Sequence, residues 1–444
     1  MRRLLLAGSA LALVVVAAAG TCGLYLVRQI DTPEFRKSLL DQARATAGAE
    51  VRVRKLDISL LSGITLEGLA IANPAPFPGD LLTADALVLR YRLLPLLAGR
   101  VEVEKLDLDK PALGLAVDAR GVFNYERLGG AHRAPGTATA VGAVVAPLRI
   151  VLKQLVVEGA SIVVTDHTKA RLLAVEDAGF RSGFEAEGGS GEATIATVNV
   201  ADLLFVRGVR SPLAMSKDAV RLAPVRGRVA GGEATGDVTV QLGGGFRYVA
   251  SLDVKGASVK TLLAEARSTG GLTGTLAAKA TFEGSGGLPT VKGRGQGTVS
   301  GCRVEHARTL GALAGILQVP ELANPEFEEC RFEFTQTGSR LSTPVVSLWG
   351  DAVRLSGRGT LNLETSGLDY KMALALSPKL FAKVTRAELR PAFRPAADGF
   401  AAIDFRLYGT TLDPQTDLVS RLGWAAATEA AKSQLDKLFK RKPF

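Results

Sequence analysis

The chain has 444 residues, 47% of them hydrophobic, with an aromatic content of only 6% and 49 glycines. This length allows one very extended domain or two to three compact ones. With so few aromatic residues, the core must be built from valine, leucine and alanine packed in quantity. The formal net charge of +10 indicates either an anionic partner or a solvated surface with an excess of arginine.

Residues 4–27 form an uncharged apolar run between Arg3 and Arg28. At ~1.5 Å per residue, such a run can cross a bilayer as one helix. We therefore predict that residues 1–30 are a single-pass anchor with a short cytoplasmic N-terminus. The alternative is a cleaved signal peptide with its cleavage site near residues 17–19, although the apolar run is longer than usual for one.

An anchor of this kind places the rest of the chain outside the cytoplasm. An exported chain rarely meets nucleic acid, so we expect no nucleic-acid partner despite the basic balance. The anionic surface of a membrane is the acidic partner that this location favours.

An amphipathic helix is expected directly after the anchor, since Pro33 can begin it and Gly48 can end it. The hydrophobic period then changes from helical spacing to two, which predicts β-strands. Two short helices are expected among the strands, at residues 259–266 and 310–317. The segments that we distinguish are the anchor at 1–30, a helix-and-strand region at 31–128, a loop or linker at 129–147, a β-rich groove region at 148–416 and a helical, basic tail at 417–444.

Alternation of apolar and polar residues is clearest in the C-terminal half of the chain. Residues 353–363 and 368–376 predict a hairpin with one apolar and one polar side. A second sheet could cover the apolar side, as in a sandwich. A single sheet folded over like a taco would instead leave an apolar groove. The candidate groove residues are Leu276, Phe282, Leu355, Leu361, Leu363, Met372, Leu374, Leu376, Ile403, Phe405 and Leu407.

Two of the three cysteines, Cys302 and Cys330, lie in strand-like stretches on either side of the second short helix. They could form a disulfide in an oxidising compartment, or remain free thiols.

Residues that would carry catalysis or bind a metal are missing from the sequence. The histidines His132, His167 and His306 are scattered, and there is no Cys-x-x-Cys pair. The glycines that begin at Gly293 lack the helix that a dinucleotide fingerprint requires. We expect no metal, no cofactor and no enzymatic activity.

Several segments resemble known family motifs. Residues 57–64 and 93–103 resemble the N-terminal signature of the AsmA family. Residues 118–125 resemble that family's turn with an acidic residue, a glycine, and an asparagine between two aromatics. Residues 259–376 resemble its second conserved region, while the middle of the chain, around residues 170–225, is the least similar.

This resemblance implies a bacterial inner-membrane protein with a periplasmic body. Its fold would be mainly β, with an N-terminal transmembrane helix, a long curved antiparallel sheet that encloses a taco-like hydrophobic groove, and a few short helices. The implied role is transfer of phospholipid or another acyl lipid in outer-membrane biogenesis or maintenance. The alternative is a scaffold that acts through a periplasmic or outer-membrane protein partner.

Overall fold

The computed structural model describes residues 37–424 and 427, except for 38–39, 42–43, 45–46, 60–62, 93–100, 129–149, 186–187, 243–246, 269–270, 286 and 306–307. The anchor predicted at 1–30, the linker predicted at 129–147 and the basic end of the tail lie outside these described residues. No helix within the described part of the chain is long and apolar enough to span a membrane.

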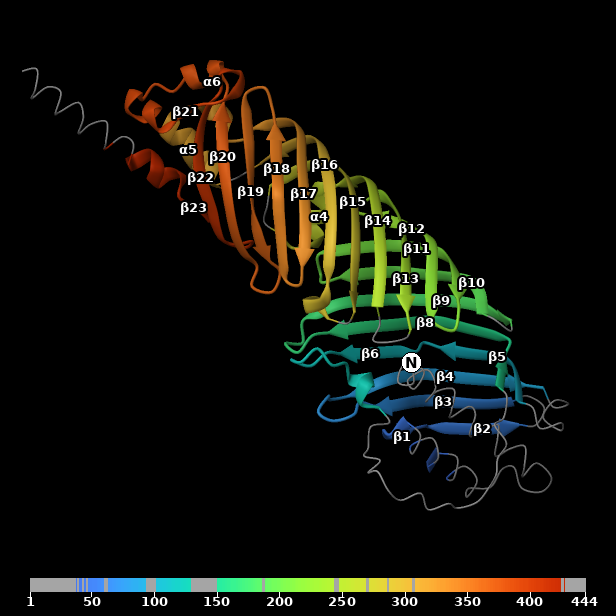
Figure 1. The fold of residues 1–444 in the computed structure, drawn as a ribbon. Coiled ribbons are helices and arrows are strands. Elements are labelled where there is room, and N and C mark those ends of the chain that lie inside the picture. The colour runs from blue at the N-terminus through green and yellow to red at the C-terminus, as the bar shows by residue number, and fades with distance from the viewer. Residues whose placement is uncertain are drawn as a thin grey trace, which may run out of the picture. The chain divides into compact units, whose positions relative to one another are not determined.

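The described chain consists mainly of β-strands with a few short helices (Figure 1), which confirms that part of the predicted fold class. It divides into two compact units. The first unit comprises Met1–Arg228, Thr235–Ala250 and Gly284–Gly287, and the second comprises Val229–Ala234, Ser251–Glu283 and Leu288–Phe444. Four strands contain residues of both units: β12 (Ala219–Val229), β13 (Gly232–Gln241), β14 (Arg247–Ser258) and β15 (Leu272–Ser285).

The first unit contains eleven complete strands and one described 3-10 helix, η1 (Asn124–Arg127). The strands are β1 (Val51–Arg52), β2 (Lys55–Ser59), β3 (Gly63–Ala72), β4 (Asp80–Tyr91), β5 (Val101–Asp109), β6 (Ala112–Ala116), β7 (Ile150–Leu152), β8 (Gln154–Thr165), β9 (Arg171–Glu185), β10 (Gly188–Val200) and β11 (Leu204–Met215). Inward side chains of β1–β5, β8 and β9, including Leu66, Leu87 and Leu89, form one core.

The strand pairing in the first unit corrects the prediction of an antiparallel sheet. Strand β5 pairs in parallel with both β7 and β8, and β6 also pairs in parallel with β8. The remaining pairs, among β1–β6 and among β8–β11, are antiparallel. The sheet is therefore mixed, because a long connection between β6 and β7 returns the chain to the end at which β5 began.

A buried asparagine organises the turn after β6. Asn124 is completely buried, and its Nδ2 donates to Asn73 Oδ1 and to the Gly114 carbonyl oxygen, each at 2.7 Å. Its Oδ1 accepts from the backbone N–H of Tyr125 at 3.0 Å. The rings of Phe123 and Tyr125 stack beside it, with their centroids 5.1 Å apart. The residues that resemble the AsmA turn therefore have a structural role, since they join two loops of the first unit.

The second unit alternates strands with short helices. Its strands are β15 (Leu272–Ser285, of which Leu272–Glu283 belong to this unit), β16 (Lys292–Val304), β17 (Glu326–Thr337), β18 (Arg340–Trp349), β19 (Val353–Asn362), β20 (Gly367–Leu376), β21 (Arg394–Pro395), β22 (Ala401–Thr410) and β23 (Pro414–Thr416). Its helical segments are α4 (Val259–Glu265), η2 (Leu288–Thr290), α5 (Arg308–Leu317), η3 (Pro320–Leu322), α6 (Pro378–Ala382), η4 (Ala387–Ala392) and η5 (Ala397–Gly399).

Strands β15 to β20 pair in sequence order, each antiparallel to the next, and β20 then pairs with β22. The predicted hairpin is confirmed as β19 and β20. Helices α4 and α5 confirm the two predicted helices, and Ser258 caps α4 by accepting a hydrogen bond from Thr261 N at 3.2 Å. Helix α6 was not predicted, although Ser377 and Pro378 are suitable N-cap and N1 residues.

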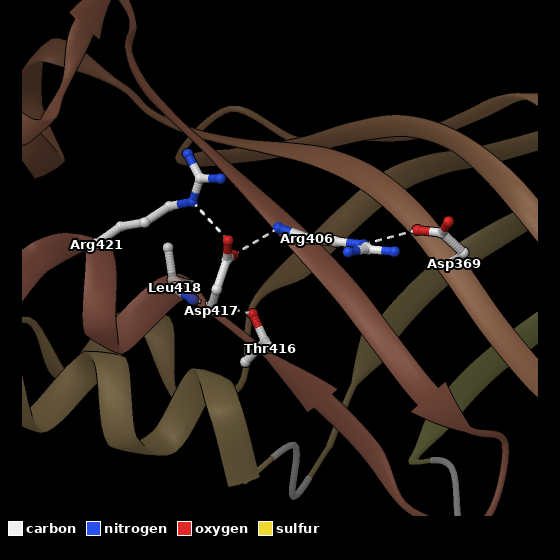
Figure 2. Close-up of polar contacts among 6 residues, drawn as sticks. All are labelled: Asp369, Arg406, Thr416, Asp417, Leu418 and Arg421. Atoms are coloured by element: carbon white, nitrogen blue, oxygen red, sulfur yellow. Dashed lines mark hydrogen bonds and ion pairs between the residues drawn. The ribbon is translucent and has the colours of Figure 1, made fainter.

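The outer edge of β22 is covered by short pieces of chain. Strand β21 pairs with its beginning and β23 with its end. Between them, the Asp417 carboxylate accepts from the Arg406 backbone N–H at 2.6 Å and from Arg421 Nε at 2.7 Å (Figure 2). Asp417 thereby ties residues 418–424, which are helical, to the edge of the sheet.

Candidate functional site

The candidate site is the apolar face, by which we mean one side of the sheet formed by β15–β20 and β22. Residues of this face alternate with residues of the opposite side, which are mostly polar, as the hydrophobic period predicts. The pairing registers align them in rows that cross the strands. One row is Ala278, Gly297, Phe332, Val346, Gly357, Met372 and Phe405.

A second row lies beside the first. It contains Ala280, Gly295 and Phe334, and, after an irregularity between β17 and β18, Thr343, Gly359, Tyr370 and Leu407. In both rows, each glycine has a large residue on one of its two neighbouring strands. A side chain on one strand can therefore extend over the neighbouring glycine.

The glycines of these rows lie under the side chains of the next strand. A Cβ atom on Gly295 would lie 2.5 Å from the Phe334 ring, and one on Gly297 would lie 2.5 Å from the Phe332 ring. Gly359 is covered in the same way by Tyr370. Real Cβ atoms do not approach other atoms so closely, so these positions must remain glycine for the rings to lie flat along the sheet.

Helices cover the apolar face at one end of the strands. There, Leu374, Leu376 and Ile403 are at most 3% exposed. They belong to one core with leucines from the helical segments, namely Leu313, Leu317, Leu322, Leu380, Leu389, Leu418 and Leu422. This end of the face is ordinary protein interior.

The rest of the apolar face is only half-buried. Among the residues predicted to line a groove, Met372 is buried, and seven others are half-buried: Leu276, Phe282, Leu355, Leu361, Leu363, Phe405 and Leu407. Leu276, Leu355 and Phe405 pack against the helix-covered core, and the remaining four extend beyond it. The structure thus brings the predicted residues onto one face but divides them between a covered end and an open end.

The described residues of the apolar face carry no charge, and each of their polar side chains Gln336, Thr343 and Tyr370 makes a hydrogen bond within the protein. Gln336 Nε2 donates to the Gly338 carbonyl oxygen at 3.1 Å. The hydroxyls of Thr343 and Tyr370 are hydrogen-bonded to each other at 2.9 Å. A surface of this kind is suited to alkyl chains and not to ions.

The opposite side of the same sheet is strongly charged. Arg406 Nε pairs with Asp369 at 2.8 Å, and Lys279 pairs with Asp253 at 3.2 Å. The hydrogen bond from Arg406 holds the pKa of Asp369 below its ordinary value. The sheet of the second unit therefore has one charged side and one apolar side.

Cys302 and Cys330 form a disulfide in the structure, with their Cα atoms 6.2 Å apart. Both are at most 5% exposed and lie in the helix-covered core. The bond connects β16 and β17 at the end of the strands that the helices cover. It therefore stabilises the sheet and does not lie among the half-buried residues of the apolar face.

Reasoning from the sequence missed three residues of the apolar face: Phe332, Phe334 and Thr343, the last of which is only 6% exposed. Tyr370 lies on the apolar side of the predicted hairpin but was not among the candidate groove residues. The two phenylalanines alternate with charged residues along residues 331–335, which is the same signal that identified the neighbouring strands. The hydroxyl pair had no sequence signal, because it depends on the register between β18, β19 and β20.

A surface pocket of about 530 Å³ lies beside β22, between η4 and residues 418–424. Its charged groups are already paired, since Arg394 binds Asp404 with two hydrogen bonds, at 2.9 and 2.8 Å, and Arg421 binds Asp417. This pocket therefore offers no unpaired charge to a ligand.

Comparison with known proteins gives one match. The model of the AsmA family matches residues 1–183, a segment that includes the signature and the turn described above. No curated protein and no solved structure matches the chain significantly.

Proposed function

Through residues 1–183 the chain belongs to the AsmA family, and from this premise we propose that it is a lipid-transfer protein. In this proposal, residues 1–30 anchor it in the bacterial inner membrane and the β-rich body lies in the periplasm. Phospholipid or another acyl lipid moves along the apolar face of the second unit in the biogenesis or maintenance of the outer membrane. The protein performs no chemical step on the lipid.

The observation that carries the proposal is the uncharged, half-buried part of the apolar face beyond the helices. Moving a phospholipid through water exposes its acyl chains at a cost of ~0.8 kcal/mol per CH₂ group. Side chains such as Leu361 and Phe334 offer those chains an apolar surface in place of water. Soluble proteins rarely leave a contiguous apolar area uncovered unless it has a binding role.

The test is photo-cross-linking in living cells, with the full chain at its natural abundance. A photoreactive phenylalanine analogue replaces Leu361 on the apolar face or, as the matched control, Thr360 on the opposite side of the same strand. We expect phospholipid adducts at position 361 and none at position 360.

The outcome also separates the two functional hypotheses. Adducts with protein but not with lipid at position 361 would favour the scaffold that acts through a protein partner. Equal lipid adducts at both positions would mean that the apolar face has no special role, and the transfer proposal would be abandoned.

A further inference from the structure

The hydroxyl pair on the apolar face has a specific geometry. Tyr370 extends from β20 over Gly359 of β19, where a Cβ atom would collide with its ring. Its hydroxyl reaches Thr343 of β18, with the two oxygens 2.9 Å apart. The pair therefore bridges three strands and places two hydroxyls in the second row, between Phe334 and Leu407.

The hydroxyl pair has one donor proton without an acceptor. Two hydroxyls carry two donor protons, and the bond between them uses one. Within the described residues, neither hydroxyl has a second hydrogen-bond partner. One O–H therefore remains able to donate, on a face whose other polar group, Gln336, is bonded to its own loop.

The surroundings determine which acceptor this donor can take. A carboxylate or phosphate would lose its hydration there without a cation to compensate, because no described residue of the face is charged. A neutral carbonyl oxygen accepts a hydrogen bond at far smaller desolvation cost. The alkyl chain attached to that carbonyl would extend over the small residues of the row, such as Gly295 and Ala280.

We propose that Thr343 and Tyr370 bind the ester carbonyl of an acyl lipid and make the face selective for ester-linked chains. This inference rests on the proposed lipid transfer and adds its substrate class. The charged headgroup stays in water, so selectivity is for the linkage and not for the headgroup. An ether-linked chain of the same length fits the apolar rows but offers only a weaker acceptor at the pair.

The test compares two lipids that differ only in linkage. The full chain is reconstituted in donor vesicles that contain either diester or diether phosphatidylcholine with equal chain lengths, and transfer to acceptor vesicles is measured. One hydrogen bond corresponds to roughly a 2- to 12-fold preference. We expect the protein to transfer the diester faster by a factor in this range.

A double variant removes both hydroxyls. T343V combined with Y370F replaces the pair by apolar groups of the same shape, which is nearly neutral for folding. We expect it to transfer the two lipids equally, at the rate of the diether with the unmodified protein. Each single variant keeps one hydroxyl, so we expect each to retain part of the preference. The control is Y408F, which removes a tyrosine hydroxyl from the opposite side of the sheet.

Three results would overturn the inference. The unmodified protein could transfer both lipids at the same rate, or the double variant could slow both lipids equally, which would indicate a structural role for the pair. If neither lipid is transferred by any of these proteins, the proposed function itself fails, and the selectivity fails with it.

Discussion

Two leucines on the same side of the sheet have different environments. Leu374 is 1% exposed beneath the helices, whereas Leu361 is half-buried on the open part of the face. A charge at Leu374 would be desolvated without a partner, so we expect L374E to unfold the second unit. L361E should cost about 1 kcal/mol or less and yet reduce lipid transfer strongly.

Thermal unfolding by circular dichroism and vesicle transfer together measure this difference. S356E is the control, since it places the same charge at an exposed position on the opposite side of β19, where the cross-strand neighbours Ser347 and Ala373 are uncharged, and it should affect neither quantity. If L361E lowers stability as much as L374E does, the open part of the face is in fact closed core.

The glycines under the rings give a second residue-scale prediction. We expect G295A to destabilise the second unit by roughly 1–3 kcal/mol, because the added methyl group would displace the Phe334 ring. Gly311 lies in α5, where a Cβ atom would meet nothing within 4 Å. G311A should therefore stabilise the protein, by up to ~1 kcal/mol. Denaturant titration of both variants checks the sign, and a stabilising G295A would contradict the described packing.

At the scale of elements, Asp417 connects residues 418–424 to the rest of the second unit. Its partial burial opposes ionisation, but hydrogen bonds from the Arg406 backbone and the Arg421 side chain outweigh this and hold the pKa of Asp417 below 3.8. A lowered pKa means that the ionised carboxylate stabilises the fold above pH 3.8. That stabilisation is lost as the pH falls through the lower pKa of the folded state.

We therefore expect D417N to be less stable than the unmodified protein near neutral pH, with the difference shrinking below pH 3.8. Urea unfolding across this pH range measures the effect. Loss of the ionic hydrogen bond to Arg421 should also loosen residues 418–424, so hydrogen exchange at Leu422 is expected to accelerate in the variant. An identical pH profile for the two proteins would show that Asp417 does not fasten this helix.

The hydrophobic pattern of the sequence predicted some features of these elements and not others. Alternation along β19, β20 and β22 identified which residues share a face, because that depends only on the strand period. It could not show that Leu374, Leu376 and Ile403 would be covered. Their cover comes from α5, α6 and residues 418–424, which are distant in sequence from at least some of the strands they contact.

At the scale of the whole molecule, the chain contains separate cores. Leu66 and Leu87 belong to a core of the first unit, whereas Leu313 and Leu374 belong to the core of the second. The AsmA match falls in the first unit, and the proposed lipid-binding face lies in the second. The parallel pairing of β5 with β8 was not predictable from the sequence. The hydrophobic period shows which residues of a strand share a face, but not which distant strand that strand pairs with.

Separate cores predict separate responses to mutation. N124A removes two buried hydrogen bonds that join Asn73 and Gly114 to the turn after β6. We expect a loss of roughly 2–4 kcal/mol confined to the first unit. Hydrogen exchange with mass spectrometry should show faster exchange in β3 and β6 and no change in β19 or β20. Equal acceleration in both units would mean that they unfold as one.

The covered edge of β22 has a consequence for how the protein behaves when it is crowded. An open edge strand invites a strand from a neighbouring molecule, which is a common route to aggregation. Here β21, β23 and the Asp417 carboxylate already occupy backbone positions along that edge. Copies at high local concentration should therefore be able to collide at this edge without joining their sheets into fibrils.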